Sequence, residues 1–207
     1  MLTLIGDILN IVMLAASPLV FAPLLFLATG SRAMGEFISK IASLADTLNR
    51  RVAAGTVWLA LAMALVQFVI VILRYIFGVS LISMQESMIY MHGALFLLGA
   101  GYTLLNDDQV RVDIFYRESP PQRKALVDLA GTYLFLAPVC TLAIWMAGPY
   151  VAASWAVREG SNEASGVQAI FLLKSLIPIF AILLLVQGTA IAARAARTLR
   201  PMPSAAG

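Results

Sequence analysis

Five long apolar stretches constrain the fold of this chain more than any other feature of its sequence. They are roughly residues 8–29, 53–77, 81–105, 125–157 and 167–193. Each supplies the about 20 mostly apolar residues that a helix needs to cross about 30 Å of hydrocarbon. Helices satisfy their own backbone hydrogen bonds, and the alternating pattern of a membrane β-barrel is absent. The sequence therefore predicts an all-α, polytopic membrane helical bundle with about five transmembrane helices.

The composition excludes a water-soluble fold. Of the 207 residues, 61% are hydrophobic and only 12% are charged, whereas soluble domains are about half apolar and about a quarter charged. The net charge of +3 does not indicate nucleic-acid binding, because the basic residues are scattered between apolar runs. We expect one membrane domain over residues 1–200 and a short disordered tail at 201–207.

The first apolar stretch is predicted to be an additional N-terminal helix over residues 8–29. A signal peptide would carry Lys or Arg before its apolar region. None precedes Ile8, and Asp7 is acidic, which favours a retained helix over a cleaved signal. Pro18 and Pro23 are expected to kink it.

Residues 34–52 differ from the apolar spans because they alternate apolar and charged residues with a helical period. The apolar positions are Phe37, Ile38, Ile41, Leu44, Leu48 and Val52, and charged residues fall mostly between them. This pattern predicts an amphipathic helix on the membrane surface. Packing against a partner subunit is an alternative, and both arrangements can hold together. A four-helix core is then expected over residues 53–197.

The basic residues predict the orientation of the chain. Eleven of the 14 Lys and Arg follow the first, third or fifth span: Arg32, Lys40, Arg50, Arg51, Arg111, Arg117, Arg123, Lys124, Arg194, Arg197 and Arg200. The other connections hold only Arg74, Arg158 and Lys174. Cytoplasmic loops are enriched in Lys and Arg. The N-terminus is therefore expected in the periplasm and the C-terminus in the cytoplasm.

The fourth apolar stretch is too long for a simple span. Its roughly 33 residues would extend about 50 Å as one helix. We expect it to kink near Pro138 or Gly148–Pro149, to tilt, or to protrude from the membrane.

The inventory of reactive residues argues against enzymatic chemistry and a bound cofactor. His92 is the only histidine and Cys140 the only cysteine, so the chain alone cannot form a bis-histidine haem site or a multi-histidine metal site. No phosphate-binding G-x-x-x-x-G-K-[ST] loop is present. His92 is interpreted as a neutral side chain hydrogen-bonded to a neighbouring helix, with a proton relay as the alternative.

Charged residues beside the second and third spans form the candidate functional cluster. Arg74 and Glu86 flank a short turn at Gly78 at similar depth, so they can pair as a structural clamp or as part of a transport path. Lys174 is expected either to join them as a triad or to extend toward the interface. Glu159 and Glu163 flank the next external loop.

Several segments together resemble the small membrane subunit of TRAP transporters, the DctQ-like family. They are Arg74-Tyr75-x-Phe77, Glu86, Leu97-Leu98-Gly99-Ala100, Val110-Arg111-Val112-Asp113-Ile114, Ala156-Val157-Arg158-Glu159-Gly160-Ser161 and Leu173-Lys174-Ser175-Leu176-Ile177-Pro178. The resemblance covers roughly residues 36–197 and is greatest to the mannitol, chloroaromatic-compound and 2-oxo acid branch. The stretch 8–29 departs from the four spans common in the family, and Gln109 stands where many members have His.

The resemblance implies a function and a set of partners. A large multi-span subunit would hold the substrate and sodium sites and move as an elevator, while a periplasmic binding protein would deliver a small organic acid. This chain would be the scaffold subunit in the bacterial inner membrane. The implied contact residues are Arg74, Tyr75, Glu86, His92, Asp113 and Lys174, with Arg158, Glu159 and Glu163 as docking candidates.

Two alternatives to the scaffold subunit remain open at this point. One is the membrane anchor of a redox complex, whose haem ligands a partner would have to supply. The other is a self-contained small transporter or channel. The absence of broken helices and inverted repeats from the sequence pattern favours the scaffold subunit over a substrate-carrying domain.

Overall fold

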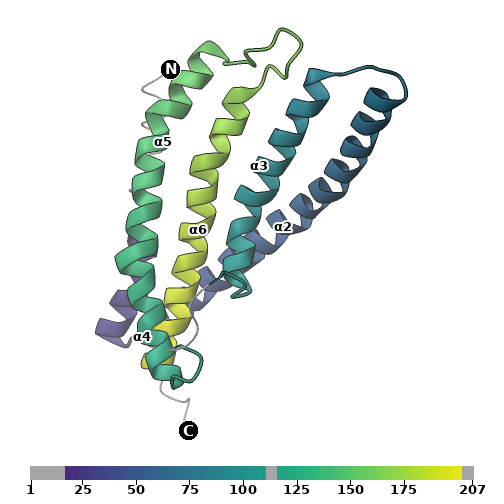
Figure 1. Ribbon diagram of the computed structural model, residues 1–207. Helices are drawn as coiled ribbons and strands as arrows, with labels where there is room; N and C mark the ends of the chain where they lie inside the picture. The colour runs from purple at the N-terminus through teal and green to yellow at the C-terminus, as the bar shows by residue number, and fades with distance from the viewer. Residues whose placement is uncertain (1–16, 111–115, 202–207) are drawn as a thin grey trace.

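The computed structural model describes residues 17–110 and 116–201, which form helices joined by turns and loops. The elements are α2 (Arg32–Tyr75), α3 (Ile82–Leu105), α4 (Pro121–Gly131), the π-helical turn η1 (Thr132–Leu136), α5 (Ala137–Val157) and α6 (Ile170–Leu199), as Figure 1 shows. A shorter apolar helix, Ser17–Thr29, precedes α2. Within residues 17–110 and 116–201, four helices are long and apolar enough to cross a membrane: α2, α3, α6 and the continuous run Pro121–Val157. The prediction of an all-α membrane bundle is confirmed.

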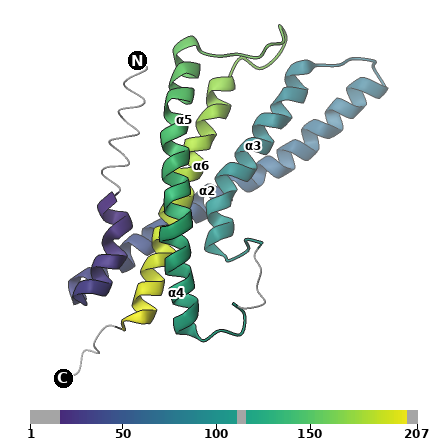
Figure 2. The same ribbon diagram turned by 60° about the vertical axis from the view of Figure 1, so that its left-hand side comes forward.

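Helix α2 joins two segments that the sequence pattern separated. The amphipathic segment and the second apolar stretch form one helix of 44 residues, about 66 Å long at 1.5 Å per residue. Figure 2 shows this helix running obliquely behind α5 and α6. Its first half buries Ile38, Ala42 and Ala45 in a cluster with the Ser17–Thr29 helix and α6. One face of the amphipathic segment therefore packs inside the chain, while Leu44 on another face is 70% exposed.

The helix Ser17–Thr29 is the described part of the predicted N-terminal span, and residues 8–16 lie outside the described residues. Phe26 packs into the same buried cluster. The Tyr133 hydroxyl donates a hydrogen bond to the Val20 carbonyl (2.6 Å), and Arg200 donates to the Leu27 carbonyl (2.5 Å). Gly30 adopts φ +62, a left-handed conformation that suits glycine, and the chain turns there into α2. The helix is thus fixed at both its ends.

Helix α6 is the centre of the bundle. It packs against α2, α3, α4, η1 and α5, whereas α5 packs, among these six elements, against α6 and η1. The second half of α6 is lined with small buried residues: Gly188, Ala190, Ala192, Ala193, Ala195 and Ala196. A Cβ at Gly188 would lie 2.3 Å from the Leu136 side chain. Small side chains let helix backbones approach closely where no hydrophobic effect drives association.

The long fourth stretch is irregular at Pro138. The turn η1 ends one residue before α5, whose second residue is Pro138. Proline has no N–H to donate to the preceding turn, and π-helical turns are a recognised source of helix bends. A π-helical turn thus lies directly before Pro138, one of the two places where a kink is predicted, and Pro149 lies within α5.

The two ends of the bundle differ in charge. The turn at residues 76–81 and the α5–α6 loop lie at one end, which we name the loop end; the α3–α4 connection and the last turn of α6 lie at the other, the basic end (Figure 1). The described basic residues of the first half of α2, the α3–α4 connection, α4, and the last two turns of α6 with the residue after it are Arg32, Lys40, Arg50, Arg51, Arg117, Arg123, Lys124, Arg194, Arg197 and Arg200. Pro201 is described, but the rest of the expected tail is outside the described residues.

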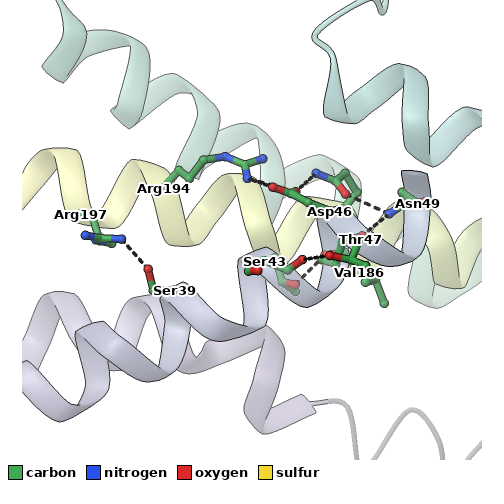
Figure 3. A network of polar contacts seen from close by, with 11 residues as sticks. Ser39, Ser43, Asp46, Thr47, Asn49, Val186, Arg194 and Arg197 are labelled. Carbon is green, nitrogen blue, oxygen red and sulfur yellow. Dashed lines mark hydrogen bonds and ion pairs between the residues drawn. The ribbon is translucent and has the colours of Figure 1, made fainter. Parts of the chain in front are cut away.

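A polar network joins α2 to α6 toward the basic end, and Figure 3 shows it. Asn49 and Gln187 are both fully buried, and the Asn49 amide donates a hydrogen bond to Gln187 Oε1 (2.9 Å). Gln187 in turn donates to Asp46 (3.0 Å), whose carboxylate also pairs with Arg194 (3.0 Å). A Cβ on Gly101 of α3 would lie 2.0 Å from Asn49 Oδ1. Three helices therefore meet at Asn49.

We predict that Gln187→Leu lowers the free energy of unfolding by about 1–3 kcal/mol, because the buried Asn49 amide and the Asp46 carboxylate lose a partner. The measurement is reversible unfolding of the purified chain in detergent. Gln67→Leu is the matched control, since Gln67 is an exposed glutamine within the apolar part of α2. Equal stability of the two variants would show that the network does not hold α2 against α6.

Candidate functional site

The carboxylate of Glu86 on α3 holds the α5–α6 loop. Its Oε1 accepts a hydrogen bond from the Ser161 hydroxyl (2.5 Å), and its Oε2 accepts one from the backbone N–H of Val167 (2.6 Å). One turn further along α3, the Tyr90 hydroxyl donates to the Val167 carbonyl (3.3 Å). Hydrogen bonds to an ionised carboxylate are stronger than neutral ones. We name these contacts the Glu86 clasp.

Two glycines lie at close contacts within the loop. A Cβ on Gly166 would lie 2.3 Å from Ser161 Oγ and 2.6 Å from Glu86 Oε2. A Cβ on Gly160 would lie 1.7 Å from the side-chain oxygen of Gln168. Real Cβ atoms do not approach other atoms this closely. The clasp thus depends on the absence of a side chain at Gly166, whereas the exposed Gln168 side chain can move away from position 160.

A second contact fixes the loop beside α6. Lys174 donates a hydrogen bond to Glu159 across an ion pair, and its ammonium lies 4.1 Å from the centroid of the Tyr150 ring. The Trp155 indole N–H also donates to Ser175 of α6 (2.8 Å). The hydrogen bond from Lys174 holds the pKa of the Glu159 carboxyl below its ordinary value of 4.5.

Within the described residues, neither the Arg74–Glu86 pair nor the triad that was one alternative for Lys174 is formed. Glu86 faces the α5–α6 loop, and Lys174 pairs with Glu159. Arg74 is exposed and lies beside the turn residues Val79 and Ser80. Matched depth on two antiparallel helices does not determine the direction in which each side chain points, and here the directions differ.

Two other predicted contact residues lie on the outer surface of the α2–α3 hairpin. Tyr75 ends α2 and is 80% exposed. His92 is exposed on α3, with its ring 4.5 Å from the Phe96 ring. Within the described part of the chain, the expected hydrogen bond from His92 to a neighbouring helix is not formed. Both side chains are therefore accessible to a partner.

The predicted docking residues differ in their surroundings. Arg158 is exposed and adopts φ 48 directly after α5, so it turns the chain into the loop. Glu163 is exposed near the loop tip, whereas Glu159 is committed to Lys174. Asp113 lies outside the described residues.

Sequence reasoning did not identify the residues that form the Asn49–Gln187 network or the glycines of the α5–α6 loop. Asn49 and Gln187 stand within helical segments rich in apolar residues, and buried amides inside a membrane bundle require partners. Their polarity was thus a usable signal, although it did not identify the pairing. Gly160 and Gly166, which lie within the loop, were a second signal for a closely packed turn.

The polar groups of the described residues contact one another. Among residues 17–110 and 116–201, no three His, Cys, Asp or Glu side chains are grouped so as to hold a metal ion. The charged and polar contacts described above connect helices and loops of the chain itself. The described fold and these contacts define a polytopic helical membrane protein whose helices are joined by polar contacts near both ends of the bundle.

The family comparison identifies the class of transport system. Residues 63–198 match the family described as tripartite ATP-independent periplasmic transporters, DctQ component. This match spans well over half of the chain, so the chain belongs to that family, and the resemblance found in the sequence is confirmed. No curated protein and no solved structure matches it.

Membership of this family has direct consequences. DctQ components work with a large membrane subunit and a periplasmic binding protein, so this chain is a transporter component and not an enzyme. Together with its apolar helices, the family also places it as a multi-pass inner-membrane protein. Transport is therefore favoured over the redox-anchor alternative.

We predict that the order of the α5–α6 loop depends on pH through Glu159. Because the folded state lowers the pKa of Glu159, its ion pair stabilises the loop fully above about pH 4.5 and is lost as the pH falls through the lowered value. A spin label at Ser165→Cys should therefore gain mobility below about pH 4.5.

Glu159→Gln should raise the label's mobility already at pH 7 and flatten its pH dependence. Glu163→Gln is the control, because Glu163 is an exposed loop carboxyl with no ion pair in the described part of the chain. Identical pH profiles for the wild type and Glu159→Gln would exclude a role for the Lys174–Glu159 pair.

Proposed function

We propose that this chain is the small scaffold subunit of a sodium-coupled tripartite transporter for small organic acids. Its membership of the DctQ family is the observation that carries the proposal. The resemblance to the mannitol, chloroaromatic-compound and 2-oxo acid branch suggests the substrate class. In this proposal the large subunit holds the substrate and sodium and moves as an elevator, while this chain stays fixed.

The continuity of the spanning helices supports a scaffold role. Substrate-carrying membrane domains commonly contain helices broken by unwound segments at the substrate site. Each described spanning helix here runs without an unwound segment, including the stretch of η1. Substrate recognition is accordingly assigned to the other components.

The exposed α2–α3 hairpin supports a partner in the membrane. In the most apolar part of each of these two helices only 6% of the residues are buried, against 22% in α6. Figure 2 shows the hairpin extending away from α5 and α6. Its exposed aromatic residues include Trp58, Phe68, Phe77 and Phe96. Such a surface is available for lipid and for a large membrane subunit.

The charge distribution suggests the orientation. The positive-inside rule assigns the basic end to the cytoplasm, and with it the C-terminus that follows α6. The loop end then faces the periplasm, where Arg158 and Glu163 are placed to help dock the binding protein. A first span over residues 8–29 would put the N-terminus on the periplasmic side.

The test of the proposed function is reconstitution. We expect proteoliposomes that contain this chain and its large subunit to accumulate a small organic acid when a sodium gradient and the binding protein are supplied. Omission of this chain should reduce uptake to the level of empty liposomes. A potassium gradient of equal size is the control for sodium coupling. Uptake by this chain alone would contradict the proposal.

Single cysteines test the orientation. Cys140 is the only native cysteine and is buried, so its background labelling should be low. We expect a membrane-impermeant maleimide to label Ser165→Cys in intact spheroplasts, and to label Arg123→Cys only after the membrane is permeabilised. The unmodified chain is the control. The reverse labelling pattern would invert the topology.

A further inference from the structure

Building on the proposed function, we propose that the α5–α6 loop is a preformed docking surface for the soluble binding protein, with Glu86 as its positioning residue. Glu86 belongs to α3, which is not adjacent to this loop in the sequence. Both carboxylate oxygens of Glu86 nevertheless accept hydrogen bonds from loop groups, Ser161 and Val167. Its contribution is to fix the loop's shape.

The loop is constrained from both sides. The Glu86 clasp holds its middle and its later part from α3, and the Lys174–Glu159 pair holds its beginning from α6. Within the loop, Ser161 Oγ also accepts the backbone N–H of Glu163 (3.1 Å). Fixing a residue's backbone costs about 1–2 kcal/mol of conformational entropy. A loop that is already ordered does not incur this cost again when a partner binds.

The chemistry of the loop fits a folded soluble protein better than lipid. Its tip exposes the small or polar residues Asn162, Glu163, Ala164 and Ser165, and Arg158 is exposed at its start. No large hydrophobic side chain between Arg158 and Ala169 is exposed, whereas Val157 and Leu172 on the adjoining helices are. A surface with both charge signs and free polar groups resembles the polar rim of a transient protein interface.

Three variants separate this role from others. Glu86→Ala removes both acceptors, and Gly166→Ala disturbs the clasp from the loop side, since its Cβ would meet Ser161 and Glu86. Glu86→Gln should preserve the clasp, because its amide oxygen can accept from Val167 while its NH₂ donates to the Ser161 hydroxyl. Ser83→Ala is the control, because Ser83 is exposed on the same helix as Glu86 but lies outside the loop and the clasp.

The experiment measures uptake by the reconstituted complex while the concentration of substrate-loaded binding protein is varied. For Glu86→Ala and Gly166→Ala we expect the half-saturating concentration of binding protein to rise about tenfold with an unchanged maximal rate. Glu86→Gln and Ser83→Ala should resemble the wild type. A spin label at Asn162→Cys should gain mobility in Glu86→Ala and Gly166→Ala only.

Other outcomes overturn the proposal. A lowered maximal rate with an unchanged half-saturating concentration in both Glu86→Ala and Gly166→Ala would place Glu86 in the transport step. Loss of activity in Glu86→Gln would show that its charge, not its hydrogen bonding, is required. If Glu86→Ala does not assemble with the large subunit, the half-saturating concentration and the label mobility of Gly166→Ala test the proposal instead. If wild-type uptake needs no binding protein, the proposed function fails, while the label still reports whether Glu86 orders the loop.

Discussion

The buried contact between Asn49 and Gln187 is the constraint on which the rest of the bundle depends. Inside a membrane bundle, packing supplies little directional information, because apolar side chains fit lipid as well as one another. Two fully buried amides are different, since each must find a partner. Their pairing fixes the register of α2 against α6, and Gly101 brings α3 to the same point. Because α6 contacts every other element from α2 to α5, fixing α2 against α6 also fixes α2 relative to the other helices.

The loop end applies the same principle with a carboxylate in place of the amides. Glu86 joins α3 to a loop whose ends belong to α5 and α6, although α3 and α5 do not pack directly. Polar contacts therefore connect helices at both ends, and the apolar stretches between them are left largely exposed in α2 and α3. The helices are thus cross-linked near the two ends of the bundle, whereas the apolar surfaces of α2 and α3 are left largely without contacts from the described chain.

Sequence reasoning predicted those features that depend on local pattern. The apolar stretches predicted the spanning helices, and Pro138 predicted the irregularity in the fourth one, because both follow from neighbouring residues. The partners of Glu86 and Lys174 could not be predicted in this way. Depth along a helix follows from the residue count, but direction around its axis depends on tertiary packing. The Asn49–Gln187 pair joins positions 138 residues apart, and no local pattern specifies such a pairing.

In the proposed scaffold role, this subunit needs stiffness more than it needs a binding cavity. If a large subunit moves substrate across the membrane, the part that it moves against must resist the same forces through every cycle. The amide network and the Glu86 clasp both connect segments far apart in the sequence, so each resists relative displacement of whole helices. Bending of a single helix would not relax either contact. The buried and half-buried polar residues in these contacts therefore have a structural role as cross-links between helices.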